Sequence, residues 1–106
     1  MKTEKSSQEA LVEDMRAGGL LSEEFTGLYR ATRAAYKDAC ARYSGLVAQY
    51  AARTPSGEKL DAADQAFLAE AFAAVLAAQR EHNFIVDGIG EILQSAMQGA
   101  AERGEL

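Results

Sequence analysis

The sequence predicts an all-α protein built on a long antiparallel helical hairpin, and two seams of regularly spaced residues carry this prediction. All the tyrosines of the chain lie seven residues apart, and adding the residues three or four away gives a first seam of Phe25, Tyr29, Thr32, Tyr36, Ala39, Tyr43, Leu46 and Tyr50. A second seam follows the only proline: Leu68, Phe72, Val75, Gln79, His82, Val86, Ile89, Leu93 and Ala96. A spacing of about 3.5 residues is typical of helices that pack along their length as coiled coils.

Capping and breaking residues place the helix boundaries within one domain of 106 residues. Residues 1–5 are polar and charged, so we expect them to be disordered. Ser6 or Ser7 can cap a short helix over 7–17, which Gly18 and Gly19 end, and Ser22 can cap a second helix over 22–53.

A turn over residues 54–60 is expected to separate the second and third helices, because it contains Pro55 and Gly57. Asp61 can then cap the third helix, over 61–103. Gly88 and Gly90 make residues 87–90 the segment most prone to a kink. A short connection of this kind makes neighbouring helices antiparallel.

Charge supports this pairing, and placing Arg53 level with Asp61 across the turn sets the register. Residues 25–57 hold five basic residues and one acidic residue, whereas residues 58–106 hold nine acidic and three basic residues. Opposite fields favour contact between the two long helices. In the register that follows, Tyr43 faces Phe72, Tyr36 faces Gln79, and Thr32 faces His82.

Composition argues against several classes of function. The net charge of −5 disfavours general binding to nucleic acid or to an anionic membrane, so a protein is the expected partner. The sequence has no apolar stretch long enough for a signal peptide or a membrane span. A single cysteine, Cys40, suits a reducing compartment, and we expect a cytoplasmic protein or one exported without a cleaved signal.

Four polar residues fall within the two seams and form the most distinctive predicted cluster: Thr32, Tyr36, Gln79 and His82. Such residues commonly set the register of a helical bundle, with their polar groups hydrogen-bonded to one another. The only histidine could alternatively act as a pH switch, a metal ligand or a general base. Zinc and di-metal sites need more ligands than the chain offers, so no cofactor, metal or catalytic residue is predicted.

Small residues line the face of the second helix opposite the tyrosines, and we interpret this stripe as a contact surface. Its members include Gly27, Ala31, Ala34, Ala41, Gly45 and Ala48. Alanine is also simply a good helix former on an exposed face. Small side chains nevertheless allow another helix to approach closely, and the third helix supplies further interface candidates in Gly88, Ile92 and Met97.

Two helices alone cannot cover all the apolar residues, so the sequence predicts a homodimer with a four-helix core. The apolar residues left over on the third helix are Leu76, Ile85, Ile92 and Met97. The expected function is therefore a non-enzymatic assembly or adaptor protein with a helical partner. The alternatives are an accessory subunit or chaperone of a secretion, phage or plasmid system, or a binder of a small apolar ligand in a tyrosine-lined bundle.

Overall fold

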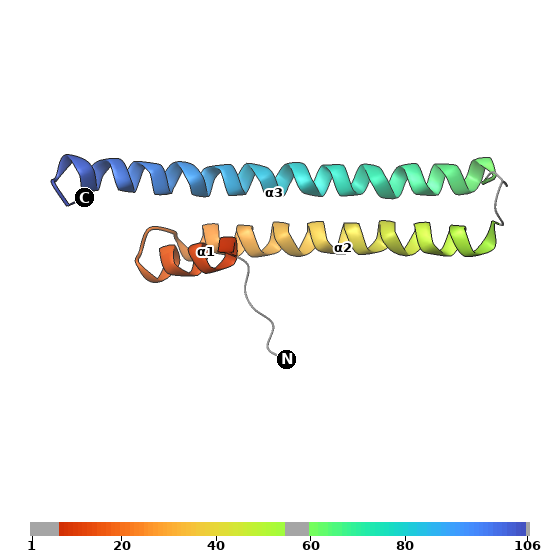
Figure 1. Cartoon of the computed structure of the whole chain (residues 1–106), viewed down its shortest axis with the longest axis horizontal. Helices are drawn as coiled ribbons and strands as arrows, with labels where there is room; N and C mark the ends of the chain where they lie inside the picture. Colours follow the sequence, from red (N-terminus) through yellow and green to blue (C-terminus); the bar gives the residue numbers. More distant parts are fainter. Residues whose placement is uncertain (1–6, 55–59, 106) are drawn as a thin grey trace. The chain divides into compact units, whose positions relative to one another are not determined.

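The computed structural model describes residues 7–54 and 60–105, and within them it contains three helices and no strand. The helices are α1 (Ser7–Ala17), α2 (Glu23–Arg53) and α3 (Ala62–Glu102), coloured along the sequence in Figure 1. The all-α prediction is confirmed. Expected disorder at residues 1–5 and most of the expected turn at 54–60 lie outside the described residues.

Side-chain caps explain where α2 and α3 begin. The backbone N–H of Phe25 donates to Ser22 Oγ at 3.0 Å, and the backbone N–H of Asp64 donates to Asp61 Oδ1 at 2.8 Å. Each cap satisfies a donor that the first turn of a helix leaves unpaired. The bounds observed for the three helices differ from the expected ones by no more than one residue.

Glycine ends α1. Gly19 has a φ of 82°, and the backbone N–H of Leu20 donates to the carbonyl of Met15 at 2.8 Å, which closes the last turn of the helix. The glycines within residues 87–90 do not end α3. The helix continues through this segment, which was expected to be prone to a kink.

The chain divides into two compact units, which are described separately. The first contains residues 1–30 and 83–106, and the second contains residues 31–82. The single domain expected from the length of the chain therefore remains a prediction.

The first unit has a core to which all three helices or their flanking residues contribute. Its buried members are Val12, Met15, Leu21, Tyr29, Ile85 and Ile89, with Phe25, Val86, Ile92 and Leu93 partly buried against them. The hydroxyl of Tyr29 reaches Gln8 Oε1 at 3.0 Å, so this ring is both buried and hydrogen-bonded. Helix α1 is thus held by a shared core, as so short a helix requires. Ile85 and Ile92, which two helices alone were expected to leave uncovered, belong to this core or pack against it, and α1 contributes Val12 and Met15 to the same core.

The second unit is a pair of helical segments, from α2 and α3. Tyr43 contacts Phe72 with ring centroids 5.4 Å apart, and Arg53 Nη2 lies 3.3 Å from Asp64 Oδ2. The two contacts run in opposite directions along the segments: Tyr43 precedes Arg53 on α2, whereas Phe72 follows Asp64 on α3. This is the order that an antiparallel pairing of the two segments produces.

The shielded stripe on the α3 segment of this unit differs from the predicted seam at alternate positions. Ala71 is buried and Ala78 is half-buried, whereas Phe72 is 45% exposed and Gln79 is exposed. The facing seam on α2 carries bulky tyrosines, so small residues on α3 fit between the helices while the larger Phe72 lies at the side. The prediction that Phe72 is buried is therefore wrong.

Candidate functional site

The polar cluster of the second unit forms around His82. Its Nδ1 atom lies 3.0 Å from Thr32 Oγ1, and its ring lies parallel to that of Tyr36, with an interplanar angle of 8° and centroids 6.3 Å apart. Three of the four predicted members of the layer, Thr32, Tyr36 and His82, are therefore brought together. Gln79 is exposed and does not share this contact, because Ala78 takes the position that faces α2.

The electrostatic surroundings of the cluster favour uncharged side chains. Burial and the positive charge of Arg33 both lower the pKa of His82, with burial the larger cause. A hydrogen bond with Cys40 raises the pKa of the Tyr36 phenol, with a smaller contribution from burial. A neutral imidazole beside a hydroxyl and a phenol suits a register-setting contact.

The described residues contain neither a cluster suited to a metal ion nor a helix suited to cross a membrane. In residues 7–54 and 60–105, no cluster of three or more His, Cys, Asp or Glu side chains is arranged to hold a metal ion. No helix within the same part of the chain combines the length and the apolar character needed to cross a membrane.

The small-residue stripe of α2 lies on the surface. Gly27 of the first unit and the other five members, in the second unit, are exposed: Ala31, Ala34, Ala41, Gly45 and Ala48. A Cβ atom added to Gly27 or to Gly45 would meet no atom within 4 Å. Packing within the chain thus gives no reason for glycine at either position, and each glycine weakens an exposed helix by about 1 kcal/mol relative to alanine.

The three interface candidates on α3 divide between the core and the surface. A Cβ atom at Gly88 would lie 3.0 Å from Cζ of Phe25, so this glycine makes room for a ring of the core. Ile92 packs against the core of the first unit. Met97 is exposed, and together with Leu93 it lines an open groove that also contacts Gly90, Gln94 and Gln98.

Exposed apolar residues also occur on the second unit, on both of its helical segments. Val47 is 42% exposed, Phe72 45% and Leu76 40%. Tyr43 lies among these residues and contacts Phe72. On α2, Tyr43 is adjacent to Val47, four residues later, and to Cys40, three residues earlier. We call the surface made by Cys40, Val47, Phe72 and Leu76 the apolar edge.

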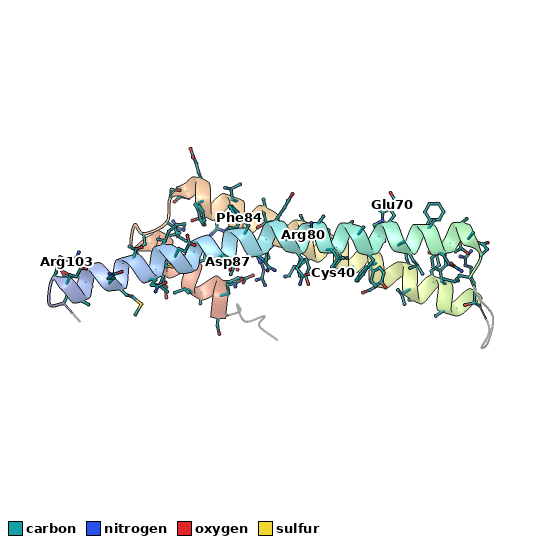
Figure 2. The ribbon with its side chains drawn as sticks, turned by 90° about the horizontal axis from the view of Figure 1, so that it is seen from above. Cys40, Glu70, Arg80, Phe84, Asp87 and Arg103 are labelled. Atoms are coloured by element: carbon teal, nitrogen blue, oxygen red, sulfur yellow. The ribbon has the colours of Figure 1, made fainter. Side chains whose placement is uncertain are left out.

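Figure 2 shows Cys40 and Glu70 toward opposite sides of α3, so the apolar edge is separated from this acidic side chain. The sequence does contain a signal for the edge. Leu76 follows Phe72 by four residues and precedes Gln79 by three, so a second 4-3 row runs beside the shielded one. The sequence prediction placed Phe72 in the buried seam, so it did not identify this row as exposed.

Comparison with known protein families, with curated proteins and with solved structures finds no match for this chain.

Proposed function

We propose that the protein is a non-enzymatic helical interaction protein that assembles with other helices through its second unit. The apolar edge is the observation that supports this proposal most directly. Isolated exposed hydrophobic residues are common on protein surfaces, but Val47, Phe72 and Leu76 come from adjoining turns of two contacting segments. A contiguous apolar patch of this kind usually marks a site of association.

The proposed architecture is a long antiparallel hairpin of coiled-coil type. Two copies would form a homodimer with a four-helix core, in which the small residues of α2 lie at the crossing. The exposed Ala41, Gly45 and Ala48 support this arrangement, because they allow two helices to approach closely. Such an assembly would serve as an adaptor in the cytoplasm, or as an accessory subunit or chaperone of a secretion, phage or plasmid system.

Binding of a small apolar ligand among the tyrosines is the weaker alternative. Tyr36 stacks on His82, and Tyr43 contacts Phe72, so both rings already have partners within the unit. Their contacts support a role in packing. This alternative would be favoured if the chain remains a monomer and binds an apolar dye less as its tyrosines are replaced.

Sedimentation equilibrium of the full chain tests the proposal. We expect a species of twice the chain mass at micromolar concentration, and we expect the double substitution Ala41→Leu, Gly45→Leu to shift it toward the monomer while helicity measured by circular dichroism is retained. Replacement of Ala10 by Leu, on an exposed position of α1, is the matched control and should leave the mass unchanged. A monomer at every concentration, with no helical partner recovered, would contradict the proposed function.

A further inference from the structure

We propose that the open groove on α3 of the first unit binds an amphipathic helix of a different protein, with lysine or arginine beside the apolar face of that helix. We call the surface lined by Gly90, Leu93, Gln94, Met97 and Gln98 the α3 groove. The inference goes beyond the proposed function, which concerns the second unit. It depends on the lining of the groove, on the acids at its border and on the division of charge between the two units.

The lining of the α3 groove carries no charge and continues the core of the first unit. Leu93 packs against that core, and Met97, four residues later, is 53% exposed. Gly90 is exposed, and a Cβ atom added to it would meet no atom within 4 Å, so a neighbouring helix can approach closely here. From Gly90 to Met97 the groove extends about 10.5 Å, or two turns of α3. Apolar contacts over such a length are typical of a helix bound in a groove.

Two acids stand along one border of the α3 groove. Glu91 precedes Gln94 by three residues and Gln98 by seven, and Glu102 follows Gln98 by four, so all four lie on neighbouring parts of the helix surface. Both acids are exposed. Within the part of the chain that the structure describes, neither takes part in an ion pair or a side-chain hydrogen bond. A partner in the groove therefore meets two carboxylates along one side.

The bases nearest these acids do not neutralise them. Arg103 donates to both carboxylate oxygens of Glu105, at 2.9 Å and 3.2 Å. It also follows Met97 by six residues, which places it about 240° around the helix, away from the groove. Arg80 precedes Glu91 by eleven residues, about 16.5 Å along the helix axis, which is too far for an ion pair.

The first unit carries the whole net charge of the chain. Residues 1–30 and 83–106 contain ten acidic and five basic residues, a net charge of −5, whereas residues 31–82 contain six of each. Two of the five bases, Arg16 and Arg30, already pair with Glu13. A basic partner is consequently attracted to the first unit, and this attraction mainly raises the association rate and the selectivity.

Charge argues against a second copy of this chain as the occupant. A symmetric contact would bring the same surface from both copies together, so Glu91 and Glu102 would meet the same two acids. The second unit of another copy offers as many acids as bases and therefore no net attraction. A helix with lysine or arginine beside its apolar face instead places positive charge opposite both acids, which are three turns apart.

Two synthetic helical peptides provide the probes. Both carry leucine at the a and d positions of three heptads, and they differ only in bearing Lys or Glu at the flanking e and g positions. Binding of each labelled peptide to the full chain is measured by fluorescence anisotropy at low and at high salt. We expect the Lys peptide to bind about tenfold more tightly at low salt, and we expect the difference to shrink at high salt.

One pair of single substitutions locates the apolar contact. Met97→Lys should weaken binding of the Lys peptide about tenfold or more, because it removes apolar contact and adds repulsion. Leu28→Lys is the matched control, because Leu28 is 51% exposed, belongs to the first unit and lies on α2. It adds the same charge away from the groove and should change the affinity by about twofold or less.

One pair of double substitutions locates the charge contact. Glu91→Gln with Glu102→Gln should remove most of the preference for the Lys peptide. Glu70→Gln with Glu81→Gln changes the net charge by the same amount, but both residues belong to the second unit, so the preference should be largely retained. Circular dichroism checks that each variant keeps its helicity.

Four outcomes would overturn the inference. Equal binding of both peptides, or binding of neither, would remove the basic partner. Equal losses with Met97→Lys and Leu28→Lys would remove the groove as the site, and equal effects of the two double substitutions would reduce the preference to overall charge. Dissociation of a dimer by Met97→Lys would place a second copy in the groove. The proposed function is tested separately, through the mass of the Ala41→Leu, Gly45→Leu variant, so either proposal can fail without the other.

Discussion

Tyr29 and Tyr43 occupy equivalent positions in one tyrosine seam, yet they have different surroundings. Tyr29, in the first unit, is 2% exposed and hydrogen-bonded to Gln8, whereas Tyr43, in the second unit, is only half-buried against Phe72. The first unit receives Val12 and Met15 from α1, and the second has no corresponding third element among the described residues. The comparison teaches that position in the seam does not by itself decide how far a ring is buried. The neighbours of each ring decide it: α1 adds Val12 and Met15 to the core that holds Tyr29, and Arg53 lies over the ring of Tyr50, which is 6% exposed in the second unit.

The largest expected difference concerns two aliphatic residues of the same helix, Ile89 in the first unit and Leu76 in the second. Ile89→Ala should destabilise the protein by about 3 kcal/mol, because the residue is buried in the core and leaves a cavity. Leu76→Ala should cost less than about 1 kcal/mol, because much of this side chain is already in solvent. Urea unfolding at low protein concentration measures both, and equal losses would contradict the distinction between the units.

Replacing glycine with alanine should stabilise the protein instead of destabilising it, and the gain should be larger in the second unit than in the first. Gly45→Ala in the second unit should stabilise the monomer by about 0.5 to 1 kcal/mol, because the position is an exposed helix interior with open space around the added methyl group. Gly88→Ala in the first unit should gain less, since the ring of Phe25 has to move. Thermal unfolding of the two variants decides the order, and a larger gain at Gly88 would show that Phe25 does not limit this site.

The stability of the second unit should depend on pH through His82. Its pKa is lowered in the folded state, so the unfolded chain takes up a proton first as the pH falls. Stability is therefore complete above about pH 6.5, the ordinary value for histidine, and declines below it toward the lowered pKa. His82→Gln should remove the part of the dependence that sets in below about pH 6.5. An unchanged slope in the variant would assign the effect to other groups.

The smallest effects are expected from exposed ion pairs. Glu13 contacts both Arg16 and Arg30 in the first unit, whereas Arg53 pairs only with Asp64 among the ion pairs described for the second. Glu13→Gln and Arg53→Gln should each cost about 1 kcal/mol or less, and the loss should diminish in high salt. A loss of several kcal/mol from either change, measured by urea unfolding, would show that the pair is much more strongly shielded from solvent than its side chains indicate.

The helices themselves were predictable because their signals are local. Ser22 and Asp61 supply caps, the tyrosines repeat at seven residues, and Gly18 and Gly19 end α1. The stripe of α3 that faces α2 was harder to predict, because apolar residues occur at both Ala71 and Phe72. The sequence prediction chose Phe72 for the buried stripe because its side chain is the larger of the two. In the structure, the smaller Ala71 lies in the space beside the tyrosines. That choice decides which residues are exposed, and it determines the position of the apolar edge.

The docking of α1 was also beyond the sequence, because Val12 and Met15 could cover any apolar surface of suitable size. The polar layer was predicted in part. Thr32 and His82 met in the expected register, but the shift of the α3 stripe left Gln79 exposed and brought Tyr36 to His82 instead.

Residue-resolved amide hydrogen exchange tests the central claim most directly, namely that the core shared with α1 makes the first unit more stable than the second. At low protein concentration, amides around Tyr29 and Ile89 should show protection close to that of global unfolding, and amides around Tyr43 and Phe72 should exchange faster through local opening. Protection in the second unit should then increase at protein concentrations at which the proposed association occurs. Uniform protection of both units in the isolated monomer, unchanged by association, would contradict the account.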